Sequence, residues 1–127
     1  MRRGPARAPA PVNLRAKAAA IPALWTPGIV GELNGQHVKL ARILGEFVWH
    51  AHEHEDECFL VLHGQLRIEF RDGEVTVGEG EMYIVPRGME HRPVAEEETH
   101  ILLFEPISTR HTGAVDDPRT VRNLEWI

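Results

Sequence analysis

The chain has 127 residues, of which 43% are hydrophobic and 26% charged, and its apolar runs are shorter than the roughly 18 residues that a membrane span needs. Its single cysteine excludes an intramolecular disulfide framework and fits a reducing, cytoplasmic setting. The formal net charge is −5, and the 110 residues after position 17 hold nine basic and nineteen acidic side chains. Because phosphate binding needs clustered Lys and Arg, this acidic body argues against nucleic acid as a partner.

The N-terminus is predicted to be a disordered basic arm, residues 1–12, ahead of a single domain at residues 13–127. The arm, MRRGPARAPAPV, has no large apolar group to bury and no apolar core of a secretory signal. Asn13 predicts the N-cap of a short helix through NLRAKAAAI. Pro22 is expected to end this helix at about Ile21.

From residue 38 onward the sequence is typical of successive β-strands. The segments HVKLARILGEFVWH and CFLVLHG are rich in β-branched and aromatic residues. QLRIEFRDGEVTV alternates apolar and polar residues around Asp72-Gly73, which predicts a hairpin. Two more strands are predicted in MYIVP and THILLFEP, each stopped by its proline. The pattern predicts an all-β sandwich or barrel, and strands that are apolar on both faces predict a homodimer.

The run HAHEHEDE, residues 50–57, places three histidines and four acids between two apolar segments. Side chains alternate along a strand, so His50 and His52 share one face, with Cα atoms about 6.6 Å apart. Two imidazoles on one face can bind one metal ion, and Glu57, which follows a tight bend, can face that ion. Mixed nitrogen and oxygen ligands suit Mn, Fe, Co, Ni or Zn better than Ca or Mg. The run by itself is equally compatible with a solvated surface loop.

A second pattern follows the first in the chain. Residues 80–91, GEMYIVPRGMEH, read G-x5-P-x-G-x2-H, and residues 50–64 read H-x-H-x4-E-x6-G. In this order, with a short spacer, they resemble the two signature motifs of the cupin superfamily. The chain is similar to small single-domain bacterial cupins of the cupin-2, mannose-6-phosphate-isomerase-like type over roughly residues 31–113.

The resemblance implies a double-stranded β-helix, also called a jelly roll, with its barrel core at about residues 38–106. It implies that one divalent transition metal (Fe, Mn, Ni, Co or Zn) is bound by His50, His52, Glu57 and His91. A register that uses His52 and His54 with Glu57 fits the family pattern less well.

The sequence departs from that pattern at two further positions. Gly45 stands five residues before the first histidine rather than six, and Ala95 replaces a common asparagine. Neither position is a ligand, so the predicted metal site is unaffected.

Cupin barrels host isomerases, dioxygenases, decarboxylases and non-enzymatic sensors, so the fold does not choose the reaction. The four intact ligands favour a metalloenzyme acting on a small polar substrate by isomerisation or dioxygenation. The alternative is a non-catalytic module that binds a metal or small ligand for sensing or storage.

Several other side chains have both a functional and a structural interpretation. Tyr83 is a candidate acid or hydrogen-bond donor near the metal, although a Tyr packed in the barrel wall explains the residue equally well. Arg87 is a candidate clamp for a substrate carboxylate or phosphate, with solvent exposure as the default. The histidines without a partner at metal spacing are expected to be ordinary residues: His37, His63, His100 and His111.

Overall fold

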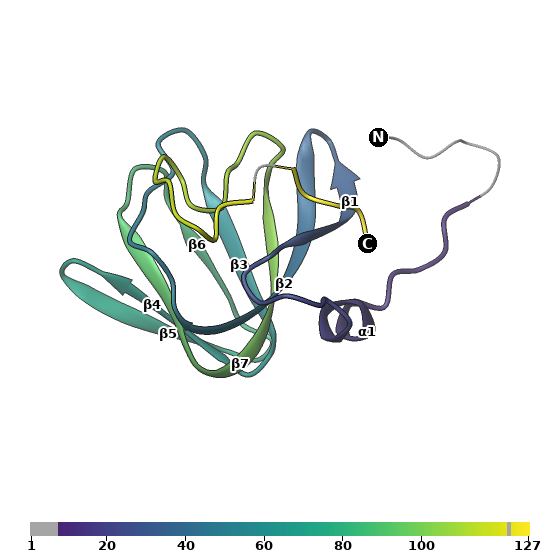
Figure 1. The fold of residues 1–127 in the computed structure, drawn as a ribbon, viewed down its shortest axis with the longest axis horizontal. Coiled ribbons are helices and arrows are strands. Elements are labelled where there is room, and N and C mark those ends of the chain that lie inside the picture. The colour runs from purple at the N-terminus through teal and green to yellow at the C-terminus, as the bar shows by residue number, and fades with distance from the viewer. Residues whose placement is uncertain (1–7, 122) are drawn as a thin grey trace.

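The computed structural model describes residues 8–121 and 123–127. In these residues one short helix precedes seven strands that form one antiparallel sheet, wrapped into a barrel (Figure 1). The elements are α1 (Leu14–Ala19), β1 (Gly28–Leu33), β2 (Gln36–Glu46), β3 (Glu57–His63), β4 (Gln65–Phe70), β5 (Gly73–Gly78), β6 (Met82–Val85) and β7 (His91–Pro106). The predicted all-β jelly roll with a short N-terminal helix is therefore confirmed. The described helix is too short to cross a membrane.

The long strand β7 organises the sheet, whose order is β1-β2-β7-β3-β6. Its first residues pair with β4, so that His91 lies opposite Phe70. Its second half pairs with β2 on one side and β3 on the other. Because one strand contacts three others, the sheet closes around a common interior and brings the start of β7 beside the loop that precedes β3.

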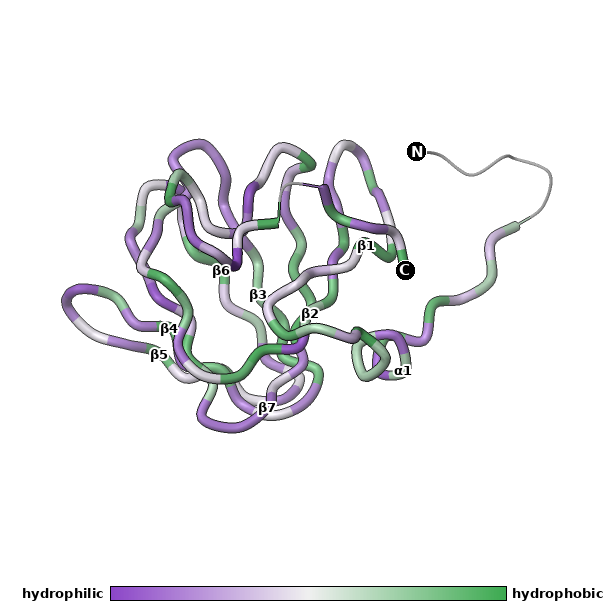
Figure 2. The backbone as a smooth tube through the Cα atoms, in the orientation of Figure 1, coloured by the Kyte–Doolittle hydropathy of each residue, from purple (hydrophilic) through white to green (hydrophobic). Residues whose placement is uncertain are grey.

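Alternation along the strands sends one set of side chains into this interior. Figure 2 shows the alternation of apolar and polar segments, with hydrophilic stretches in the loops. Leu66, Ile68 and Val61 are fully buried in the main core, and burying each such side chain contributes about 1.5–3 kcal/mol. A smaller core forms outside the barrel, where Ala18 of α1 packs near Leu40 of β2.

The helix begins as predicted, because the Asn13 side chain accepts a hydrogen bond from the Ala16 N–H at 3.0 Å. It ends at Ala19, two residues earlier than expected. Residues 1–7 of the predicted basic arm lie outside the described residues, and residues 8–12 are exposed and form neither helix nor strand.

Two parts of the sheet were not predicted from the sequence. Strand β1, GIVGEL, is short and contains two glycines, which weaken any strand pattern. Strand β7 begins at His91 rather than near Thr99. Pro93 and three exposed acids obscure its first half, although Pro93 lies opposite Ile68 in the pairing with β4.

The C-terminal segment returns across the barrel to β1 (Figure 1). Ile29 donates its N–H to the Glu125 carbonyl at 2.8 Å, and Ile127 donates to the Ile29 carbonyl at 2.9 Å. A segment outside the predicted barrel core therefore pairs with the start of β1.

Candidate metal centre

The four predicted ligands come together in the barrel from three parts of the chain. His50 and His52 lie in the loop between β2 and β3, Glu57 begins β3, and His91 begins β7. All four are buried, and one ligand atom from each lies within 4.8 Å of the others. His50 and His91 exchange backbone N–H···O bonds of 3.0 and 2.9 Å, which join the two motifs directly.

The loop around His50 differs from the continuous strand that was predicted, because β2 ends at Glu46. Alternation nevertheless persists, since His50 and His52 are both buried and Trp49 faces elsewhere. The guanidinium of Arg71 lies 3.8 Å above the Trp49 ring. Trp49 therefore packs on this chain's own arginine.

Backbone carbonyls fix the protonation of two of the imidazoles. His50 Nδ1 lies 2.9 Å from the Val48 oxygen, and His91 Nδ1 lies 3.0 Å from the Met89 oxygen. A carbonyl only accepts hydrogen bonds, so each Nδ1 carries a proton, and Nε2 is the nitrogen that keeps the lone pair in the neutral ring. This is the tautomer that a metal-binding histidine needs.

Three atoms at the centre of the cluster are buried without a hydrogen-bond partner: His52 Nε2, Glu57 Oε1 and His91 Nε2. Glu57 Oε1 lies 3.2 Å from His52 Nε2 and 3.5 Å from His91 Nε2. Leaving buried polar atoms unpaired costs about 1–3 kcal/mol each. A cation bound between them would remove that cost.

Burial and the neighbouring charges shift the pKa values of three residues of the cluster in different directions. Burial, followed by the neighbouring His91, lowers the pKa of His50 to about 4. Burial alone would raise the pKa of Glu57, but His52 and His91 outweigh it and hold that pKa well below its usual range. Burial also opposes the charged form of His52, yet the Glu57 carboxylate raises the pKa of His52 overall. At neutral pH the cluster offers an ionised Glu57 carboxylate beside the neutral imidazole of His50.

A buried ion pair lies behind Glu57 and was not predicted. Lys39 Nζ of β2 lies 2.9 Å from Glu105 Oε1 of β7, and both side chains are almost wholly buried. Burial and the Glu57 carboxylate raise the pKa of Glu105, while Lys39 acts in the opposite direction. The signal was present in the sequence, because Lys39 falls on the same face of its strand as the apolar Ala41.

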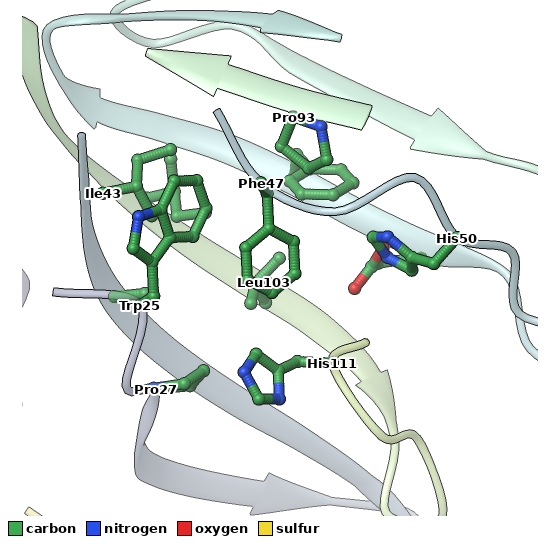
Figure 3. A pocket seen from close by; sticks show the side chains of 12 residues that line it. Trp25, Pro27, Ile43, Phe47, His50, Pro93, Leu103 and His111 are labelled. Atoms are coloured by element: carbon green, nitrogen blue, oxygen red, sulfur yellow. The ribbon is translucent and has the colours of Figure 1, made fainter. Parts of the chain in front are cut away.

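A pocket opens beside the cluster, and His50 and Glu57 belong to its lining. Figure 3 shows His50 at one side of the pocket, away from Trp25. Trp25 stacks on Phe47, with ring centroids 4.5 Å apart and planes 14° apart. The twelve lining residues are Trp25, Pro27, Ala41, Ile43, Phe47, His50, Glu57, Phe59, Pro93, Ile101, Leu103 and His111. Most of this surface is apolar.

His111 joins the pocket from the segment after β7, although the sequence predicted an ordinary residue. Its Nε2 lies 2.9 Å from the Arg119 carbonyl, so Nε2 carries the proton and Nδ1 is left without a partner. Burial lowers the pKa of His111, so its ring is neutral at neutral pH. Its distance along the chain from both motifs leaves no spacing signal by which to find it.

The remaining candidates lie away from the pocket lining. Tyr83 is half-buried, with its ring 6.0 Å from that of Phe70. Arg87 is exposed and pairs with Asp56, whose carboxylate also accepts the Arg87 N–H at 2.9 Å. His54 is exposed beside Glu53, so the structure does not assemble the alternative register.

Comparison with known proteins gives consistent matches. Residues 39–112 match the family model described as a cupin domain, Cupin_2. The crystal structure of a cupin-2 domain containing protein from Shewanella frigidimarina is 43% identical, has a TM-score of 0.73, and aligns over 75% of this chain and 93% of that one. Protein NMB1881 from Neisseria meningitidis is 34% identical, has a TM-score of 0.70, and aligns over 76% and 99% of the two chains.

A curated relative shares a shorter region. The uncharacterized protein YdbB of Bacillus subtilis is 41% identical over 64 residues, which are 50% of this chain. The match covers 57% of YdbB, less than two thirds of its length.

Proposed function

The chain belongs to the cupin family, and we propose that it is a small metal-dependent enzyme. His50, His52, Glu57 and His91 bind one divalent transition metal (Fe, Mn, Ni, Co or Zn), and the reaction on a small substrate is an isomerisation or a dioxygenation. One observation carries the proposal: three buried, unpartnered ligand atoms face one another beside imidazoles whose tautomers are already fixed.

The donor set fits such an ion. Three imidazole nitrogens and one carboxylate oxygen are typical of first-row divalent metals, and four protein ligands leave positions free for a substrate. When bound, the metal supplies a Lewis acid or a redox centre. His50 and Glu57 also line the apolar pocket, so a substrate held there lies directly beside two of the ligands.

The second candidate function is a non-catalytic module that holds a metal or small ligand. Its support is the scarcity of groups for proton transfer, since His111 is the one titratable side chain among the twelve pocket residues besides the two ligands. Turnover of keto acids, sugars and catechols by protein loaded with each candidate metal separates the two functions. Turnover of any of these substrates with any of the metals supports the proposed enzyme, and no turnover favours the non-catalytic module.

We also propose a homodimer that forms through the outer face of β3 and β6. Met82 and Ile84 of β6 are 62% and 51% exposed, and Met82 lies beside Cys58 of β3. An edge strand with large exposed apolar side chains favours a protein partner. Light scattering should give the mass of two chains, and a monomer would exclude this arrangement.

Elemental analysis of protein purified without a histidine tag tests the metal site. We expect about one equivalent of metal per chain, lost in His50→Ala and retained in His54→Ala. The second variant is a matched control, because His54 lies in the same run but is exposed. Loss of metal in His54→Ala alone would favour the alternative register, and no metal after reconstitution would refute the proposed site.

A further inference from the structure

The walls of the pocket indicate which molecules fit beside the metal ligands. Apart from His50, Glu57 and His111, the surface is made by apolar side chains, including the stacked Trp25 and Phe47 (Figure 3). Apolar walls make no hydrogen bonds, and His111 Nδ1 is the one acceptor in the lining besides the two cluster residues. A ligand with several buried hydroxyls or charges would therefore lose hydration that the pocket does not replace.

Trp25 is held in this wall by an unusual backbone conformation. Its φ is 59°, in the left-handed region that bulky residues rarely adopt. Three contacts maintain it: the Trp25 N–H donates to the Arg42 carbonyl at 2.9 Å, the indole N–H donates to the Leu44 carbonyl at 3.0 Å, and the ring stacks on Phe47. Because the indole N–H is already bonded, the ring offers a ligand only apolar surface. Strain retained at a pocket is typical of a functional position.

The Arg119 guanidinium lies close to this wall but is already bonded to other groups. The Arg119 guanidinium lies 4.8 Å from the Phe47 ring centroid. It donates to the Glu46 carbonyl at 2.7 Å and to the Asp117 carboxylate at 2.9 Å. Arg119 is therefore not free to neutralise a phosphate or a second carboxylate of a substrate.

The pocket is also small. Its free volume is about 30 Å³, room for about two water molecules. A ligand whose apolar part has only a few carbon atoms fits without displacing a side chain. The limit is set partly by Trp25, which lies outside residues 39–112 that match the family model and comes from the segment between α1 and β1.

We propose that the substrate is a small molecule with an apolar body and a single polar head group, the head group facing the metal ligands. Trp25 is the specificity-determining residue that limits the size of the body. The inference rests on the proposed function, since it assigns a substrate class to the same metal site.

The first test compares ligands that share a head group and chain length. Full-length protein loaded with Co²⁺ is titrated with butyrate and with glycerate, and binding is followed by the visible absorption of the cobalt ion. Butyrate should bind about tenfold more tightly, because glycerate carries two hydroxyl groups into the apolar walls. Equal affinities would overturn the substrate class. Failure of the protein to take up Co²⁺ would refute the proposed function, and with it this inference.

The second test concerns Trp25 itself. Wild-type protein should prefer butyrate to the larger benzoate, and Trp25→Ala should reverse that order by enlarging the pocket. Trp49→Ala is the matched control, because Trp49 packs under Arg71 away from the pocket, and it should keep the wild-type order. If Trp25→Ala does not fold, Trp25→Phe should shift the preference in the same direction. An unchanged order in a folded Trp25 variant that binds Co²⁺ would overturn the assignment.

Discussion

Two buried polar clusters meet inside the barrel, and they differ in where their partners come from. The first is Lys39 with Glu105, an ion pair of 2.9 Å between two side chains of the protein, in which Glu105 Oε2 is left without a hydrogen-bond partner. The second is the cluster of His50, His52, Glu57 and His91, in which three central atoms remain without hydrogen-bond partners although they lie within a few ångströms of one another. The comparison teaches that buried polarity alone does not indicate a site. The convergence of three unpartnered ligand atoms from different residues does.

The two clusters are electrostatically linked through their carboxylates. The neighbouring Glu57 raises the pKa of Glu105, while His52 and His91 lower that of Glu57. The imidazoles therefore favour the charged form of Glu57. Burial and Glu57 raise the pKa of Glu105 overall, and Lys39 offsets only part of that shift. Each cluster can be perturbed separately to test this division.

The largest effect on stability is expected from breaking the Lys39–Glu105 ion pair. Lys39→Met should lower the free energy of unfolding by about 3–5 kcal/mol, because it leaves the buried Glu105 carboxylate without its cation. Urea denaturation at pH 7 measures the change. The double variant Lys39→Met/Glu105→Leu should regain most of this loss, since an apolar pair of similar volume can replace a buried ion pair. A single variant as stable as the wild type would show that the pair contributes nothing.

The second expected effect is a pH dependence of the free energy of unfolding of the metal-free protein, caused by His50. The pKa of His50 is about 4 in the folded chain and about 6.5 when unfolded. Between these values the unfolded chain binds more protons, so stability falls as pH falls. The His50 contribution between pH 7 and pH 5 is about 2 kcal/mol. The raised pKa of His52 opposes this trend and reduces the net slope.

Urea midpoints at pH 7 and pH 5, measured after chelation, give this dependence. His50→Gln removes the titrating ring and should flatten the profile relative to the wild type. If the urea midpoint of His50→Gln changed with pH as steeply as that of the wild type, a residue other than His50 would cause the pH dependence. Lys39→Met should shift the whole profile downward, and that difference separates the two clusters.

The difference between the clusters also explains how much the sequence could predict. Strand alternation placed His50 and His52 on one face, with Glu57 after the bend, and left a solvated loop equally possible. The resemblance of the two motifs to the cupin signatures implied the full set with His91. Lys39 and Glu105 were predictable in principle, because each interrupts an apolar face of its own strand. Their pairing across β2 and β7 required the register of the sheet.

The pocket walls could not be predicted in this way. Trp25 and His111 come from segments before β1 and after β7, where no periodicity relates them to the motifs. Their positions depend on long-range contacts, such as the bond from the Trp25 indole to the Leu44 carbonyl. The first half of β7 was missed for a similar reason, because the pairing with β4 outweighs the local signal of Pro93.

The smallest effect is expected at the rim, where Arg87 and Asp56 join the loops of the two motifs. This pair is exposed, and Arg87 Nε lies 3.3 Å from Asp56 Oδ1. Arg87→Ala should shift the urea midpoint only slightly, and the shift should vanish in 1 M salt, where the Debye length is about 3 Å. Metal content should stay at the wild-type level. The same variant separates two roles for Arg87. If Arg87 binds substrate anions, Arg87→Ala should weaken butyrate binding to Co²⁺-loaded protein. If Arg87 only joins the two loops, butyrate binding should stay unchanged. Unchanged binding would complete the contrast: the ion pairs at Lys39 and Arg87 serve the fold, and the unpartnered cluster serves the ligand.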